Sequence, residues 1–95
     1  MIVSFIEKET EKVFNQEWSK QLPPEIQKAA LRKMIQINNA ETMLDLLSPP
    51  SNHLEKLSGD LSGKWSIRIN DQWRICFVPS SDWKDYYDVE IIDYH

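Results

Sequence analysis

The sequence predicts an α+β domain in which two N-terminal helices pack on a twisted antiparallel sheet of about four strands. The first half of the chain repeats its apolar residues at helical spacing, whereas from Ser58 onward apolar and polar residues alternate as they do in half-buried strands. With 95 residues and 41% hydrophobic composition, the chain can bury one modest core and is too small for two. We therefore expect a single domain over residues 1–95.

The first elements expected along the chain are a short strand and a helix. The β-rich run MIVSFI has the length of a strand and spans residues 1–6. A helical pattern follows and ends near Leu22, with one side formed by Val13, Phe14, Glu17 and Trp18.

A second helix is expected from Pro24 to the pair Asn38 and Asn39. Proline suits the first helical position because its missing N–H has no partner there, and Glu25 complements the positive end of the helix dipole. The apolar residues that recur at helical spacing are Ile26, Ala30, Met34 and Ile37.

The remaining elements are a short helical piece and three strands. The run ETMLDLL favours a helical turn, which Pro49 and Pro50 then interrupt because proline lacks a backbone donor. The runs KWSIRI, WRICFV and YYDVEII predict three antiparallel strands.

The register of the central hairpin follows from its apolar residues. A three-residue loop over residues 70–72 pairs Ile69 with Trp73 and Ile67 with Ile75, which gives one uniformly apolar face. A two-residue loop would mix apolar and charged residues on both faces. The other face then carries Lys64, Ser66, Arg68, Arg74, Cys76 and Val78.

This register places Arg68 directly opposite Arg74, and like charges in that position destabilise a sheet. Two interpretations are open. An acidic residue from a neighbouring strand or helix can pair with them. Alternatively, the arginines form an anion site, most naturally for phosphate, because a guanidinium matches phosphate geometry and keeps its charge. An arginine at such a surface site would add little to stability.

The chain ends with residues of acid–base type. Asp93, Tyr94 and His95 follow a β-like run, and their side chains can donate, accept or relay protons. The alternative is that these terminal residues are frayed and inert.

Composition excludes several other classes of function. The net charge of −4 argues against strong binding to bulk nucleic acid, so any such contact must be local. The lone Cys76 cannot form an internal disulfide, and the N-terminus lacks a signal-peptide core, which favours a cytoplasmic protein. His53, His95 and Cys76 lack zinc-ligand spacing, so we expect no metal and no cofactor.

The run SPPSNHLEKLSGDLSGKWSIRINDQWRICFV and the ending DVEIIDYH resemble the HigB branch of the RelE/ParE toxin superfamily, the plasmid maintenance or "killer" type. The resemblance implies a RelE-like fold and a toxin that cleaves messenger RNA in the ribosomal A site. It also implies a helix-turn-helix antitoxin of the HigA type, through which operator DNA is contacted only indirectly, and no membrane partner.

Carried over by position, the resemblance places the cationic strand residue of the family at Arg74 and its terminal acid, aromatic and imidazole at Asp93, Tyr94 and His95. Members of the family often have arginine where this chain has His53 and Leu61, and some carry His or Lys near Glu55 and Ser58. The cations left to contact RNA phosphates are Lys56, Lys64 and Arg68.

The chemistry expected is attack of a ribose 2′-hydroxyl on the adjacent phosphate with expulsion of the 5′-oxygen. Arg74 would stabilise the phosphorane charge, Asp93 or a neighbour would activate the hydroxyl, and His95 would protonate the leaving oxygen. Tyr94 would stack on or orient a base. Two other classes stay open: a gyrase poison of the ParE type, and a non-catalytic partner that modulates an operon repressor.

Overall fold

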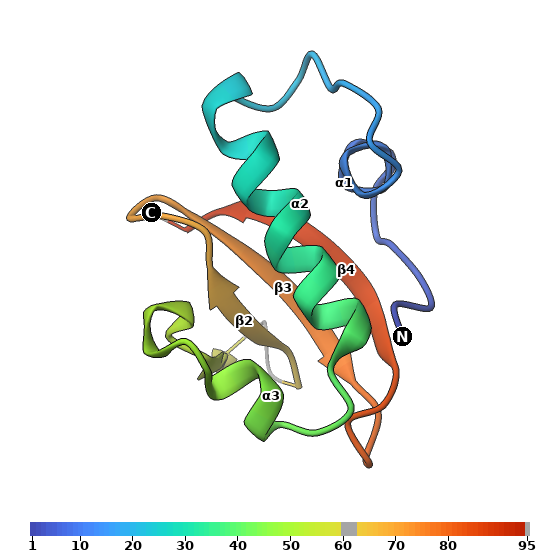
Figure 1. The fold of residues 1–95 in the computed structure, drawn as a ribbon, viewed down its shortest axis with the longest axis vertical. Coiled ribbons are helices and arrows are strands. Elements are labelled where there is room, and N and C mark those ends of the chain that lie inside the picture. The colour runs from blue at the N-terminus through green and yellow to red at the C-terminus, as the bar shows by residue number, and fades with distance from the viewer. Residues whose placement is uncertain (60–62, 95) are drawn as a thin grey trace.

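The computed structural model describes residues 1–59 and 63–94, and its centre is a four-stranded antiparallel sheet (Figure 1). The strands lie in chain order: β1 (Glu55–Lys56), β2 (Trp65–Arg68), β3 (Trp73–Pro79) and β4 (Tyr86–Asp93). The helical elements are α1 (Lys8–Phe14), α2 (Pro24–Asn39), α3 (Leu44–Leu47) and the 3₁₀ turn η1 (Pro50–Asn52). This arrangement confirms the α+β class with N-terminal helices on an antiparallel sheet.

Helix α2 crosses one face of the sheet and supplies most of the helical side of the core (Figure 1). It begins at Pro24 and ends at Asn39, as predicted, and its expected apolar residues are fully or almost fully buried. The facing core residues of the strands include Ile67, Ile75 and Phe77. Apolar residues at helical spacing and apolar residues at strand spacing therefore meet at one interface.

Helix α1 is shorter than the pattern predicted. It ends at Phe14, because Gln16 takes a left-handed backbone conformation with φ of 63° that no helix continues through. Trp18, expected on the apolar side, is 62% exposed. The loop after α1 is instead tied to α2 through Gln27, whose side-chain amide donates to Ser19 O at 2.7 Å and accepts from Ser19 N at 3.1 Å.

The predicted first strand pairs with the sheet only at two points. Ile2 and Phe5 form isolated parallel bridges with Tyr86 and Val89 of β4. Asp88, between the two bridged positions of β4, has a positive φ of 53°, and this irregularity interrupts the ladder. The sheet has four strands because β1, a two-residue strand that the alternation did not indicate, pairs with β2 at its edge.

The central hairpin has the predicted register. Trp65 pairs with Phe77, Ile67 with Ile75, and Arg68 with Arg74. Asn70 explains the three-residue loop, because its Oδ1 accepts hydrogen bonds from the backbone N–H groups of Gln72 and Trp73, both at 2.8 Å.

Among residues 1–59 and 63–94, no helix is both long and apolar enough to cross a bilayer.

Tyr86 is the largest fully buried side chain and provides a test of this core. Its ring packs edge-on to Phe77, with centroids 5.5 Å apart. The single hydrogen of its hydroxyl is shared between the carbonyl oxygens of Trp83 and Ala40, which lie 2.6 and 3.0 Å from the hydroxyl oxygen. Burial raises the pKa of this phenol to about 12.

We expect Tyr86→Phe to lower the free energy of unfolding by about 1–3 kcal/mol, because it removes the one donor that the Trp83 and Ala40 carbonyls share. Tyr87→Phe is the matched control, since Tyr87 is exposed, and it should change stability by no more than about 0.5 kcal/mol. Urea denaturation measures both variants. Equal losses would contradict the role given to the Tyr86 hydroxyl.

Candidate active site

The polar face of the hairpin contains both arginines, but the structure gives them different surroundings. Arg68 forms an ion pair with Asp71 in the exposed hairpin loop. Arg74 is only 7% exposed and turns toward β1 and η1. The expected like-charge contact is therefore relieved, because each guanidinium has its own acceptors.

Four hydrogen-bonding or ionic contacts hold the Arg74 guanidinium. Its Nε donates to Ser66 Oγ at 2.7 Å, and its Nη2 donates to the carbonyl oxygens of Ser66, at 3.3 Å, and of His53. Glu55 Oε2 lies 3.8 Å from Nη2. Glu55 is thus the acidic partner from a neighbouring strand that the first of the two interpretations expected. It acts together with neutral hydrogen-bond acceptors and does not replace them.

Within residues 1–59 and 63–94, one edge of the Arg74 guanidinium has no hydrogen-bond partner. Among the residues that the structure describes, none accepts a hydrogen bond from Nη1. An arginine that is anchored on one side and has no described partner on the other is suited to binding an anion.

Tyr94 completes this group of side chains. Its ring lies 5.3 Å from the Arg74 guanidinium carbon, and its hydroxyl donates to Glu55 Oε1 at 3.1 Å. This hydrogen bond to the carboxylate raises the pKa of Tyr94, so the phenol keeps its proton at neutral pH. We call Glu55, Ser66, Arg74 and Tyr94 the Arg74 cluster.

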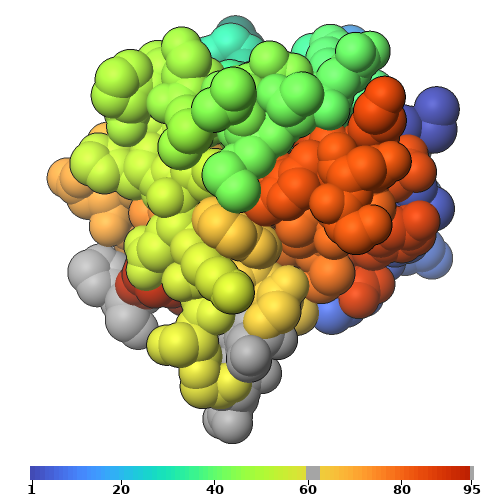
Figure 2. All heavy atoms as spheres, turned by 90° about the horizontal axis from the view of Figure 1, so that it is seen from below, coloured from blue at the N-terminus to red at the C-terminus, as the bar shows by residue number. Residues whose placement is uncertain are grey.

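The Arg74 cluster joins segments far apart in the chain. Glu55 pairs with Ser66 across β1 and β2, and the backbone N–H of Tyr94 donates to Gln72 O at 2.8 Å beyond the end of β4. Figure 2 shows the dark red C-terminal atoms beside the yellow-green atoms of the segment after η1. The Glu55 side chain is 48% exposed and Tyr94 as a whole is 42% exposed, so the cluster opens to solvent.

Asp93 does not join the Arg74 cluster. It pairs with Trp73 in the sheet, and successive strand residues point to opposite faces, so its side chain lies on the face opposite to that of Arg74. Its Oδ2 accepts a hydrogen bond from Gln72 Nε2 at 3.0 Å. His95 lies outside the described residues, as does Leu61.

The other predicted cations are dispersed. Lys56 pairs with Trp65, so it lies on the side of the sheet opposite to the polar face, and it is exposed. Lys64 is half-buried on the polar face with Cys76. Burial raises the pKa of the Cys76 thiol to about 11, so it is not a nucleophile at neutral pH.

Glu55 is the member of the Arg74 cluster that the pattern of the sequence did not single out. A two-residue strand is too short to show alternation, and its partner Arg74 is 19 positions away in the sequence. Within residues 1–59 and 63–94, no group of three His, Cys, Asp or Glu side chains is arranged to hold a metal ion.

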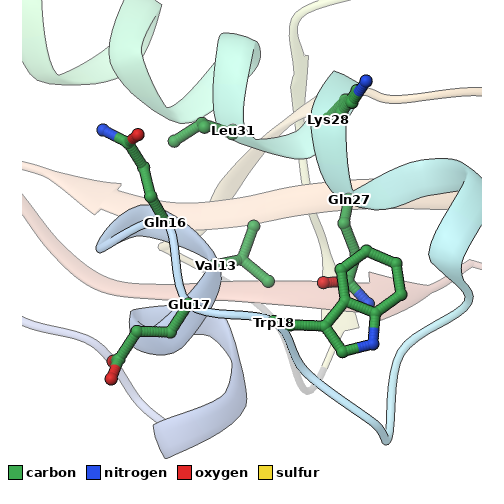
Figure 3. Close-up of a pocket in the computed structure, with 7 residues that line it drawn as sticks. All are labelled: Val13, Gln16, Glu17, Trp18, Gln27, Lys28 and Leu31. Carbon is green, nitrogen blue, oxygen red and sulfur yellow. The ribbon is translucent and has the colours of Figure 1, made fainter.

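A hollow of about 220 Å³ between the end of α1 and helix α2 is separate from the Arg74 cluster and shares no residue with it. Figure 3 shows Val13 and Leu31 on the two helices, with Trp18 beside Gln27. Apolar surface dominates its lining, which is completed by Gln16, Glu17 and Lys28. It lacks the convergent charged groups of the Arg74 cluster, and we assign no chemistry to it.

Comparison with known proteins gives consistent results. The family described as RelE-like toxin of type II toxin–antitoxin system HigB matches residues 3–95. Toxin HigB-1 of Vibrio cholerae is 41% identical over 56 residues, which are 59% of this chain and 59% of that protein. The matched part thus spans about three fifths of the length of this curated relative.

Two solved structures share the fold. One is the heterotetrameric YoeB–YefM toxin–antitoxin complex from Staphylococcus aureus, with a TM-score of 0.61, 17% identity, and coverage of 100% of this chain and 98% of that chain. The other is the RelBE2 toxin–antitoxin complex from Mycobacterium tuberculosis, with a TM-score of 0.50, 15% identity, and coverage of 98% and 95%. At these identities the likeness concerns the fold alone.

Because Arg74 is buried, its removal should destabilise the protein more than the removal of a surface arginine would. Arg74→Ala should lower the free energy of unfolding by about 1–3 kcal/mol, because it leaves Ser66 Oγ and the His53 carbonyl without their donor. Arg68→Ala, which breaks only the exposed pair with Asp71, should cost about 0–1 kcal/mol. Chemical denaturation of both variants tests this. Indistinguishable losses would mean that the Arg74 contacts add no more than a surface pair.

Proposed function

The chain belongs to the HigB-like family of RelE-like toxins from type II toxin–antitoxin systems, and on this basis we propose that it is a ribosome-dependent mRNA endoribonuclease that inhibits translation and growth. The observation that carries the proposal is the Arg74 guanidinium, which is anchored by Ser66 and His53 and lies beside Glu55 and Tyr94. Its Nη1 has no partner among the described residues. A cation that stabilises the phosphorane charge and a carboxylate that accepts a proton are two of the groups that can cleave RNA without a metal ion.

Arg74 would bind the scissile phosphate through Nη1. When the ribose 2′-oxygen attacks the phosphorus, negative charge builds up on the non-bridging oxygens, and a fixed guanidinium stabilises it. The other guanidinium nitrogens already hold protein acceptors, so Arg74 needs little reorganisation as the charge develops.

Two proton transfers accompany the attack. Glu55 is the carboxylate beside Arg74, and we propose that it accepts the proton of the 2′-hydroxyl. The bond from phosphorus to the 5′-oxygen then breaks, leaving a 2′,3′-cyclic phosphate on one fragment. His95 would protonate the departing 5′-oxygen, and Tyr94 would stack on a base or orient it.

Asp93 would act by positioning rather than by touching RNA. Its carboxylate accepts from the Gln72 side chain, while the Gln72 carbonyl accepts from the backbone N–H of Tyr94. These two contacts fix the C-terminal end of β4 against the hairpin loop. Asp93 would thereby hold Tyr94 beside Arg74.

Ribosome dependence is supported by electrostatics. The chain carries a net charge of −4, and only Lys64 and Arg68 accompany Arg74 on the polar face of the hairpin. Binding to naked RNA draws on Lys and Arg that neutralise phosphates, so free message should be a poor ligand. A ribosome that already holds the codon would supply the positioning.

The partners proposed follow from membership of the family. We propose a HigA-type helix-turn-helix antitoxin that neutralises the toxin and contacts operator DNA, and action in the cytoplasm, where ribosomes translate. The solved structures of similar fold were described as toxin–antitoxin complexes.

Two alternatives predict different behaviour. A ParE-like gyrase poison requires no acid–base group beside Arg74, and the Glu55 carboxylate favours the ribonuclease. A non-catalytic modulator of an operon repressor would leave messages intact. Sequencing of RNA ends after induction separates all three, because only the ribonuclease produces new ends within codons.

We expect purified protein to cut free message little and to cut at codon-spaced sites once translating ribosomes are added. Primer extension on the same message with and without ribosomes measures both activities. Equal cleavage of free RNA would contradict ribosome dependence.

The assignment of the proton acceptor is tested by two amide variants. Glu55→Gln removes the carboxylate beside Arg74 and should reduce cleavage by about 10²-fold or more, the scale of a positioned base. Asp93→Asn is the matched control on the opposite face and should retain most activity, because an amide oxygen still accepts from Gln72. Single-turnover cleavage on ribosomes gives both rates. The reverse order of effects would return the base to Asp93.

A further inference from the structure

We infer that Asn52, held by Lys33 of α2, is a positioning residue that sets the orientation of Arg74 through the backbone of His53. This inference rests on the proposed function in so far as Arg74 contacts the phosphate. The contacts concerned run from α2 to η1 and then to Arg74 on β3, and Lys33 and Asn52 are not among the residues that the sequence singled out.

Asn52 is fully buried, and both ends of its side-chain amide are occupied. Its Oδ1 accepts a hydrogen bond from Lys33 Nζ. Its Nδ2 lies 3.2–3.3 Å from three oxygens, which are Gln36 Oε1 on α2, Leu46 O on α3 and Ser48 O just after α3. The two amide hydrogens are therefore shared among three acceptors. One side chain thus joins η1 to two helical elements.

The residue after Asn52 carries the contact to the candidate active site. His53 has a φ of 45°, in the left-handed region that few residues other than glycine enter. Its N–H donates to Pro50 O at 3.1 Å, and its carbonyl accepts from Arg74 Nη2. Such a conformation persists only where the surroundings determine it, and Asn52 supplies the adjacent buried anchor.

The position of this carbonyl matters for the free edge of Arg74. Ser66 holds Nε and one hydrogen of Nη2 from β2, whereas the His53 carbonyl holds Nη2 from the η1 side. Because a guanidinium is planar, a displaced His53 carbonyl would turn the Nη1 edge away from its present direction. A misplacement of about 1 Å in such a group can cost about 10²-fold in rate.

The first measurement does not depend on activity. In the full chain labelled with ¹⁵N, we expect the Arg74 guanidinium to give separate, slowly exchanging Nη signals. Asn52→Asp and Lys33→Met should merge or broaden these signals, whereas Ser51→Ala, at an exposed neighbour, should leave them unchanged. Unchanged signals in a folded Lys33→Met variant would overturn the inference, and this variant carries the test if Asn52→Asp does not fold.

The second measurement is a double-mutant cycle on ribosome-dependent cleavage. Asn52→Asp and Lys33→Met should lower kcat by about 10-fold or more and change KM by less than about 2-fold. In an Arg74→Ala background the same substitutions should cause no further loss. Equal fold-losses in both backgrounds would show a merely structural role and overturn the inference.

The two measurements separate this inference from the proposed function. If Arg74→Ala cleaves as well as the wild type while the guanidinium signals still respond to Lys33→Met, the catalytic role of Arg74 fails and the positioning contact stands. If Arg74→Ala loses most of its cleavage rate and the signals do not respond, the positioning inference fails alone.

Discussion

The placement of one guanidinium group organises this end of the molecule. Arg74 lies in the central part of the sheet, opposite a second arginine, and is almost completely buried. A charge removed from water in this way must find compensation, because the desolvation of an unpaired ion costs several kcal/mol or more. The protein meets this requirement with two carbonyl oxygens, one hydroxyl and one carboxylate, contributed by β1, β2 and the residue after η1.

This compensation also explains why the surrounding segments lie where they do. The two-residue strand β1 brings Glu55 beside Ser66, and the left-handed residue after η1 aims a carbonyl at Arg74. Beyond β4, Tyr94 covers the guanidinium and shares Glu55 with it. A charge that is neutralised mainly by dipoles keeps its attraction for an anion, whereas a tight carboxylate pair would compete with that anion. The 3.8 Å separation from Glu55 is consistent with the looser arrangement.

Much of the fold could be predicted from the sequence because it depends on local periodicity. Helix α2 followed from apolar spacing and a proline at its start, and the hairpin register followed from the requirement for a uniform apolar face. The end of α1 was missed, because the left-handed Gln16 stops a helix whose apolar pattern runs on. Arg74 was singled out as a candidate because the alternation places it on the polar face, opposite a second arginine.

The parts of the site that escaped prediction depend on contacts between distant segments. Glu55 and Asn52 carry no periodic signal, and their contacts arise only when η1 and β1 fold against β2 and α2. The assignment of Asp93 and Tyr94 to one site assumed that consecutive residues act together. In a strand they point to opposite faces, so only Tyr94 reaches Arg74.

The most direct test of this account is a structure of the protein bound to a translating ribosome whose message carries a 2′-O-methyl group at the cleavage site, which prevents attack. The account predicts that Arg74 Nη1 lies within hydrogen-bond distance of a non-bridging oxygen of that phosphate, while its contacts to Ser66 and to the His53 carbonyl are kept. A phosphate bound elsewhere, out of hydrogen-bond reach of Arg74 Nη1, would contradict the account.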